Sequence, residues 1–316
     1  MLTALILICA VVAIPDLADC SEKNARVVMV VPGQFQSQIT CAMRGQAYVA
    51  ETAIGRDLEE TDRIKVVCTH RETQDSPVAD APSRTLSGAR VSGADGVITD
   101  VNIVTALDIS DSVDPEWMRI EIEGTARAIL APEVIRAIQR GRHGRIGFAV
   151  FAWYHDGIYP ELVSWTLIVS EKDAMRVSNQ IADCLRIADE AEGRKRSNIH
   201  HLGRLTDLSA AIDHAGELLL MAPYATERAV VNIIGNGADN LGEDPQRARD
   251  SLIGQGGTIN GVVLGGDLSV LDYYRQRVIG GPGAFLLSAH NIDMIIVLLA
   301  RKFHYDIVMQ SAVAPR

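Results

Sequence analysis

The chain has 316 residues, with 30 Lys and Arg against 40 Asp and Glu, so its formal net charge is −10. Hydrophobic residues make up 47% and charged residues 22% of the sequence, a composition typical of globular proteins and not of disordered or collagen-like chains. Because nucleic acid and anionic lipid bind clustered Lys and Arg, the acidic balance argues against non-specific binding to either. The length predicts two domains, or one large domain with an appendage.

Residues 1–20 have the composition of an export signal. Residues 2–14 form an uncharged apolar run that is too short to span a bilayer and has the length of a signal-peptide core. Ala18 and Cys20 place small residues before a cleavage point, and residues 17–20 resemble a lipoprotein cleavage box. We therefore expect an exported protein, periplasmic or membrane-anchored through its N-terminus. A buried N-terminal strand, or a wrongly assigned start, is the alternative.

The five cysteines have the pattern of structural residues. Cys9 and Cys20 lie in the presumed signal, whereas Cys41 and Cys68 lie in stretches that we predict to be strands of one N-terminal region. A bridge between the latter two would stabilise the fold by about 3–4 kcal/mol on the loop-entropy model. Cys184 lies in a helical pattern and is expected to be a buried thiol. No Cys and His spacing typical of a zinc site occurs.

The composition and hydrophobic pattern of the sequence change once along the chain. Residues 26–31, 38–41 and 63–69 are predicted strands separated by polar turns. Residues 71–95 are rich in Ser, Asp, Ala, Pro and Gly and predict a linker or long loop. We therefore divide the chain into three parts: a signal or anchor segment at 1–20, a β-rich region with its linker at 21–95, and a main domain at 96–310.

From residue 97 onward, short apolar runs alternate with helical patterns. The predicted strands are 101–107, 146–153, 162–168, 230–234, 258–264 and 284–288. The predicted helices are 115–140 with a break near Pro132, 171–190, 207–222, 245–254, 268–276 and 291–303. This alternation predicts an α/β fold, a doubly wound, mostly parallel sheet with helices on both faces. Such a fold binds ligands at the carboxyl ends of its strands.

The first predicted strand of the main domain ends in Asp108, which Ser110 and Ser112 follow at alternate positions. A carboxylate and two hydroxyls in this pattern place three hard oxygen ligands on one tight loop. They suit Mg²⁺, Mn²⁺ or Ca²⁺ better than zinc or copper. The alternative is that these residues only cap the following helix and bond to nearby backbone amides.

This D-x-S-x-S loop resembles the metal-ion-dependent adhesion site of the von Willebrand factor type A family. In that family a Thr and an Asp from two later loops join the site, and here Thr206 and Asn236 stand at those positions. The resemblance covers residues 97–310. Three further segments resemble a largely uncharacterised bacterial branch of exported type A-like domains: 141–146, 164–167 and 278–285.

The resemblance implies a non-catalytic adhesion or recognition domain. The cation, Mg²⁺ or else Mn²⁺ or Ca²⁺, would be held by five residues: Asp108, Ser110, Ser112, Thr206 and Asn236. An exposed Asp or Glu of a partner protein would complete its coordination. Nucleic acid is not an expected partner.

Asn236 departs from the family pattern, because an amide keeps the oxygen ligand but removes one negative charge beside the cation. Two unit charges 4 Å apart interact by about 4 kcal/mol at an effective dielectric of 20. Losing half of that would weaken cation binding by more than about tenfold. Asp111, Asp207 and Asp239 are nearby acids that could restore the charge. The alternative is a degenerate, metal-free scaffolding or structural domain.

Enzymatic motifs do not support a catalytic reading. The sequence contains neither a G-x-S-x-G nucleophile elbow nor an H-E-x-x-H zinc motif, and we predict no catalytic residue. A Mg²⁺-dependent phosphohydrolase built on Asp108 is the remaining enzyme alternative, although Ser110 stands where such an enzyme has a second acid.

Overall fold

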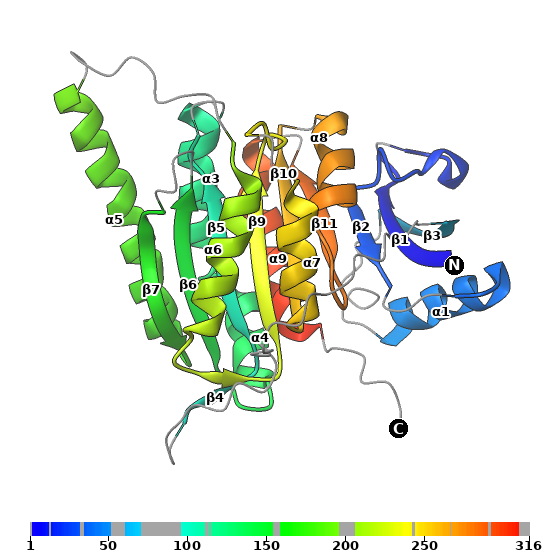
Figure 1. The fold of residues 1–316 in the computed structure, drawn as a ribbon, viewed down its shortest axis with the longest axis horizontal. Coiled ribbons are helices and arrows are strands. Elements are labelled where there is room, and N and C mark those ends of the chain that lie inside the picture. Colours follow the sequence, from blue (N-terminus) through cyan, green and yellow to red (C-terminus); the bar gives the residue numbers. More distant parts are fainter. Residues whose placement is uncertain are drawn as a thin grey trace.

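The structure, a computed structural model, describes residues 2–12, 14–31, 35–51, 61–70, 96–110, 113, 115–153, 159–195, 206–241, 244–265, 267–289 and 292–309. This part of the chain builds one nine-stranded sheet: β1 (Leu2–Ala10), β2 (Val27–Val30), β3 (Asp62–His70), β5 (Asn102–Asp108), β6 (Ile146–Trp153), β7 (Glu161–Ile168), β9 (Ala229–Gly235), β10 (Gly257–Leu264) and β11 (Phe285–Ala289). The strands lie in the order β3-β1-β2-β11-β10-β9-β5-β6-β7 (Figure 1). Two short strands, β4 (Ile98–Thr99) and β8 (Ala225–Thr226), pair separately.

The middle of the sheet is parallel. Neighbouring strands from β11 through β10, β9 and β5 to β6 run in one direction, and β7 pairs antiparallel with β6. Numbered from β5 along the chain, these six strands have the order 3-2-1-4-5-6 of the doubly wound dinucleotide-binding fold. The predicted fold class is therefore confirmed. The order reverses between β5 and β9, which is where this architecture binds ligands.

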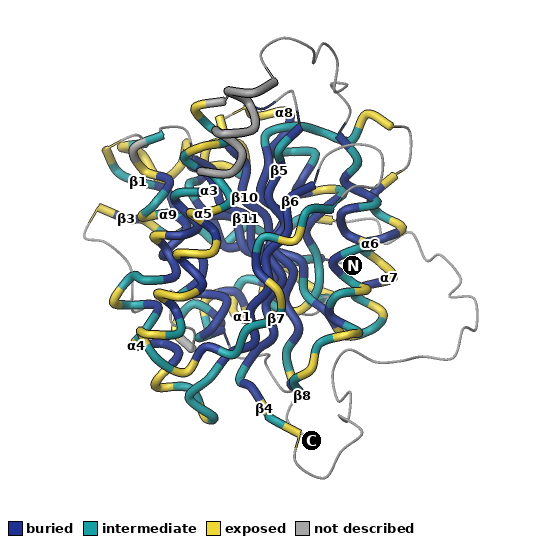
Figure 2. Tube along the Cα trace, turned by 90° about the vertical axis from the view of Figure 1, so that its left-hand side faces the viewer, coloured by how far each residue is buried: buried dark blue, intermediate teal, exposed yellow. Residues whose placement is uncertain are grey.

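Helices cover both faces of the sheet, so the strands form a buried layer between them (Figure 2). One face packs against α3 (Pro115–Ala128), α4 (Pro132–Arg140), α5 (Glu171–Lys195) and α9 (Ile295–Val308). The other packs against α6 (Leu208–Leu220), α7 (Pro245–Gly254) and α8 (Leu268–Tyr273). Side chains of β5 alternate between the two cores, with Ile103 and Leu107 in the first and Val104 and Ala106 in the second. Each buried aliphatic side chain contributes about 1.5–3 kcal/mol to folding.

A buried polar cluster fixes α9 to the centre of the sheet. Lys302 and Asp306, one helical turn apart on α9, form an ion pair of 3.0 Å and are both fully buried. Asn232 of β9 donates to Asp306 at 2.8 Å, and Asn260 of β10 donates at 2.9 Å. Burial lowers the pKa of Lys302, whereas the charge of Asp306 acts in the opposite direction. The cluster consists of two charged side chains from α9 and two amide side chains from β9 and β10. Hydrogen bonds as well as packing therefore specify the register of α9 on the two strands.

The apolar run that we expected to be an export signal forms β1. This strand pairs antiparallel with β2 on one side and with β3 on the other, and β2 pairs antiparallel with β11. The N-terminal strands therefore extend the main sheet, and the alternative of a buried N-terminal strand describes the conformation of these residues. Cleavage after Cys20 would remove the strand to which both β2 and β3 pair. Every helix that the structure describes falls short of the length and hydrophobicity that a bilayer span requires.

The prediction of a strand at residues 38–41 is wrong, because this segment begins helix α1 (Gln38–Glu51). The hydroxyl of Ser37 accepts a hydrogen bond from the amide of Thr40 at 3.2 Å, which satisfies one of the free amides at the start of the helix. Cys41 and Tyr48, two helical turns apart, face the core and are buried. The sequence signal of β-branched residues at this point was therefore overridden by tertiary packing.

The bridge between Cys41 and Cys68, which the sequence left open, is present and joins α1 to β3 with a Cα–Cα distance of 6.2 Å. A second bridge, which the sequence analysis did not predict, joins Cys9 of β1 to Cys20, beside the short helix η1 (Leu17–Asp19). Cys184 is a free thiol that is half-buried, not fully buried as expected. The two bridges hold the N-terminal strands together at two separate points.

Replacing both Cys41 and Cys68 by Ser is expected to lower the free energy of unfolding by about 3–4 kcal/mol, because the bridge closes a loop that the unfolded chain otherwise explores freely. Urea unfolding followed by circular dichroism measures the change. Cys184→Ser, which breaks no bridge, is the matched control and should shift the unfolding free energy by less than about 0.5 kcal/mol. Equal stability of the double variant and the control would contradict the prediction.

Candidate functional site

Two of the predicted ligands lie where the order of the sheet reverses. Asp108 is the last residue of β5, and Asn236 follows β9 directly. These strands are parallel neighbours, so their carboxyl ends meet at one edge of the sheet (Figure 1). A doubly wound fold leaves a crevice at this point, because the chain leaves the two strands toward opposite faces.

The carboxylate of Asp108 is fully buried. Its Oδ1 accepts a hydrogen bond of 2.9 Å from the amide of Ser110, whereas Oδ2 has no hydrogen-bond donor among the described residues. Burial raises the pKa of Asp108 to about 6, although hydrogen bonds from Ser110 and from the amide of Asn236 act in the opposite direction. A carboxyl group in this setting holds a proton or needs a positive partner.

Two further buried groups surround Asp108, and the sequence analysis predicted neither. Glu121 of α3 is fully buried. Burial raises the pKa of Glu121 well above its ordinary value and the charge of Asp108 raises it further, whereas a hydrogen bond from the backbone amide of Asp108 acts in the opposite direction. Tyr274 begins a short π-helical turn, η2 (Tyr274–Val278), and its buried hydroxyl has no described partner.

The missing side chain of Gly235 makes room for this cluster. A Cβ atom at Gly235 would lie 2.7 Å from the hydroxyl of Tyr274 and 3.0 Å from Oδ2 of Asp108. Both oxygens therefore converge on the same stretch of bare backbone at the end of β9. Burial raises the pKa of Tyr274, and the charges of Asp108 and Glu121 raise it further, so the phenol stays protonated.

The loop after β9 is hydrogen-bonded to the start of α6. The amide of Thr206 donates to Oδ1 of Asn240 at 2.8 Å, and the amide of Asn240 donates to the carbonyl of Thr206 at 3.1 Å. Oδ2 of Asp239 accepts from the amides of Leu208 at 2.8 Å and Ser209 at 3.2 Å. These bonds hold the buried Thr206 beside the loop that also carries Asn236.

The structure thus brings Asp108, Ser110 and Asn236 together and connects Thr206 to them through the loop after β9. Ser112, like Asp111, lies outside the described residues. Among the described residues, no three His, Cys, Asp or Glu side chains form a group that could hold a metal ion. A cation here would therefore depend on hydroxyl and amide oxygens besides Asp108, a donor set that suits hard cations.

Two acids that could have restored the missing charge have other partners. Asp207 caps α6, because its Oδ1 accepts from the amide of Ala210 at 2.9 Å. Asp239 accepts from the first amides of the same helix and also, through Oδ1, from the amide of Leu241 at 3.0 Å. Both carboxylates therefore stabilise the helix N-terminus, where a negative charge is favourable.

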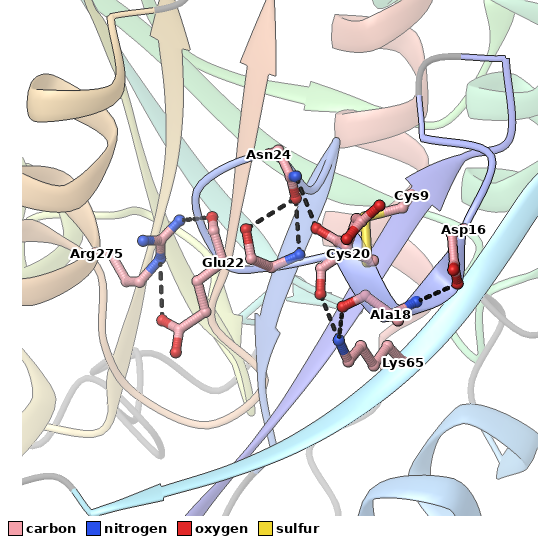
Figure 3. Close-up of a disulfide and its surroundings, with 10 residues drawn as sticks. Cys9, Asp16, Ala18, Cys20, Glu22, Asn24, Lys65 and Arg275 are labelled. Carbon is pink, nitrogen blue, oxygen red and sulfur yellow. Dashed lines mark hydrogen bonds and ion pairs between the residues drawn. A yellow bond between two sulfur atoms is a disulfide. The ribbon is translucent and has the colours of Figure 1, made fainter.

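The N-terminal region contacts Arg275, the residue after Tyr274. The guanidinium of Arg275 is buried and binds the carbonyl of Glu22, its carboxylate at 3.5 Å and Asp272 at 2.5 Å. Figure 3 shows that Glu22 lies on the loop that follows Cys20, whose carbonyl accepts from Lys65 of β3 at 2.7 Å. The loop after the first disulfide is therefore attached both to β3 and to the turn that carries Tyr274.

Residues 98–311 match the family described as "Protein of unknown function (DUF1194)". The chain belongs to this family. The match begins at β4 and therefore includes Asp108, Glu121, Thr206, Asn236 and Tyr274. No curated protein matches the sequence.

Three solved structures show how distant the structural likeness of this DUF1194 member is. Proximal thread matrix protein 1 from the mussel byssus is 12% identical, covers 66% of this chain and 48% of its own, and has a TM-score of 0.43. The same protein with a zinc-occupied MIDAS motif is 14% identical, covers 67% of this chain and 48% of its own, and has a TM-score of 0.43. The pilus adhesin SpaC from Lactobacillus rhamnosus GG is 9% identical, covers 66% of this chain and 31% of its own, and has a TM-score of 0.46. The DUF1194 chain spans less than half the length of each of these proteins.

Gly235→Ala is expected to lower the free energy of unfolding by about 1–3 kcal/mol, because the added methyl group would overlap the hydroxyl of Tyr274. Adding Tyr274→Phe removes that oxygen and should recover part of the loss. Gly254→Ala is the control, since nothing lies within 4 Å of the position that its Cβ would take. Urea unfolding that shows equal stability for the Gly235 and Gly254 variants would rule out the crowding described here.

Proposed function

We propose that the protein is a non-catalytic recognition domain that binds a partner protein through a divalent cation held at Asp108. The observation that carries this proposal is the buried Oδ2 of Asp108, which has no described hydrogen-bond donor and stands at the edge of the sheet where doubly wound folds bind ligands. An orphaned carboxylate oxygen of this kind is costly unless something positive binds to it.

The ligands that we propose are the oxygens of five residues: Asp108, Ser110, Ser112, Thr206 and Asn236. The cation, Mg²⁺, Mn²⁺ or Ca²⁺, would supply a positive centre to which an Asp or Glu of the partner protein binds. The amide of Ser110 orients Asp108, and the hydrogen bonds between Asn240 and Thr206 join the loop after β9 to the segment before α6. We propose no catalytic step for this site.

Both disulfides fit a protein exported to an oxidising compartment. We propose a periplasmic or membrane-anchored location on this basis. We also propose residues 96–310 as the binding domain, with β1, β2 and β3 as an extension of its sheet. Their attachment through the pairing of β2 with β11 supports one folded unit.

A metal-free scaffolding domain is the second candidate, and the lack of a described group of three acids favours it. In that reading Asp108 stays protonated, and the loops after β5 and β9 contact a partner without a cation. The two candidates differ in one measurable property, which is the affinity for divalent cations.

Calorimetric titration of the full chain with Mg²⁺, Mn²⁺ and Ca²⁺ is expected to give saturable binding that Asp108→Ala abolishes. Asn236→Asp should raise the affinity by about tenfold or more, because it adds a negative charge beside the cation. Asp250→Ala, which removes an exposed carboxylate on α7, is the control and should leave binding unchanged. Absence of binding by both the wild type and Asn236→Asp at millimolar cation would leave the scaffolding function as the conclusion.

A further inference from the structure

We propose that the buried polar cluster between α9 and β9 is the site of an autocatalytic amide cross-link, in which Nζ of Lys302 replaces the side-chain nitrogen of Asn232 and ammonia is released. The bond joins α9 covalently to the centre of the sheet. This inference goes beyond the recognition function and does not depend on the cation site, because none of the residues involved is a proposed cation ligand.

The nucleophile is the side-chain amine of Lys302, which is 0% exposed. Its described contacts are the amide oxygen of Asn232, the carboxylate of Asp306 and the ring of Phe285, whose centroid is 5.2 Å from Nζ. Burial lowers the pKa of Lys302, although the charge of Asp306 acts in the opposite direction. An amine attacks a carbonyl carbon only in its neutral form, and a desolvated lysine reaches that form more readily than a lysine in water.

The electrophile is the side-chain amide of Asn232, which is buried in β9. Its oxygen accepts a hydrogen bond from Lys302, so the amide carbon lies one carbonyl bond, about 1.2 Å, beyond the atom that the amine already contacts. Its nitrogen donates to Asp306 at 2.8 Å and to the hydroxyl of Thr105 at 3.3 Å. The fold therefore holds the amine, the carbon and the leaving nitrogen together, which removes most of the entropic cost of the reaction.

Asp306 is placed to carry the protons. Its Oδ2 lies 3.0 Å from Nζ of Lys302 and 2.8 Å from the side-chain nitrogen of Asn232. One oxygen thus contacts both the group that loses protons and the group that gains one. Asn260 of β10 donates to Oδ1 at 2.9 Å and keeps the carboxylate in this position. Asp306 can therefore act first as the general base and then as the general acid.

The reaction balances without a cofactor or an oxidant. Asp306 takes a proton from the ammonium of Lys302, and the neutral amine attacks Cγ of Asn232. Asp306 passes its proton to the leaving nitrogen and takes a second one from the attacking nitrogen. The bond between Nζ and Cγ forms, the bond between Cγ and Nδ2 breaks, and ammonia leaves. The core then holds an uncharged amide and a protonated Asp306, so the reaction also removes a buried ion pair, which is costly to desolvate.

The geometry selects Asn232 over the other amide beside Asp306. The side-chain oxygen of Asn260 accepts a hydrogen bond of 3.0 Å from the backbone amide of Phe285. No described hydrogen bond joins Lys302 to Asn260, whereas Lys302 donates directly to Asn232. The structure therefore points to one product, the bond between Lys302 and Asn232.

Mass spectrometry of the full chain, with its disulfides reduced, tests the proposal. The wild type should be lighter than its sequence by one molecule of ammonia, and tryptic digestion should give one branched peptide that contains Asn232 and Lys302. Lys302→Met and Asp306→Asn should each have the mass of their sequences, because the first lacks the nucleophile and the second lacks the proton carrier. Lys172→Met, which removes an exposed lysine on α5, is the matched control and should keep the loss of ammonia.

Two results would overturn the cross-link. The first is a wild type of full mass that yields separate peptides for Asn232 and Lys302. The second is a loss of ammonia that persists in Lys302→Met, because it would then come from ring closure at an Asn-Gly pair such as Asn236-Gly237. Should the single variants not fold, Lys302→Met combined with Asp306→Leu removes both buried charges at once and should likewise have the mass of its sequence. Cation binding plays no part in this measurement, so its result leaves the recognition function to be decided separately.

Discussion

Asp108 ends β5, and its carboxylate is buried with one oxygen that has no described donor. Several neighbouring residues contact this carboxylate or leave space for it. The amide of Ser110 donates to Oδ1, and the absence of a side chain at Gly235 avoids a collision with Oδ2. The charge of Asp108 also raises the pKa of the buried Glu121 on α3. A buried carboxylate destabilises the protein when it is ionised and unpaired. A bound cation or a proton would remove this cost. The cost of this site is therefore the burial of a carboxylate without enough hydrogen bonds.

Much of the fold could be predicted from the sequence, because strands that are covered on both faces are apolar throughout. Every residue of β5, β6 and β9 is buried, and the predicted bounds differ from the observed ones by one residue at most. The break between α3 and α4 was predicted from Pro132, which occupies the first turn of α4. The N-terminal region was less predictable. The apolar run at 2–10 has the composition of a signal core and also of a buried strand, and its pairing with β2 and β3 depends on long-range contacts that the pattern does not contain.

The site was predictable to the extent that its residues follow strands directly. Asp108 ends β5, Ser110 and Asn236 follow strands closely, and the positions of these strand ends depend on the order of the strands. Glu121 was missed because its approach to Asp108 depends on the rotation of α3 about its own axis. One signal was available: Glu121 is in helical phase with the buried Thr125 and Ala128, so it lies on a face where a charged residue is unexpected. The roles of Asp207 and Asp239 depend on side-chain direction, which the sequence pattern does not contain.

The first disulfide has a consequence for the distant edge of the sheet. The bridge between Cys9 and Cys20 holds the loop that carries Glu22, and Glu22 binds Arg275 next to Tyr274 (Figure 3). A reducing agent that opens this bridge would remove one constraint on the loop that carries Glu22, and therefore on a contact of the turn that carries Tyr274. The oxidation state of this cysteine pair thus bears on the surroundings of Asp108, although neither cysteine lies beside it.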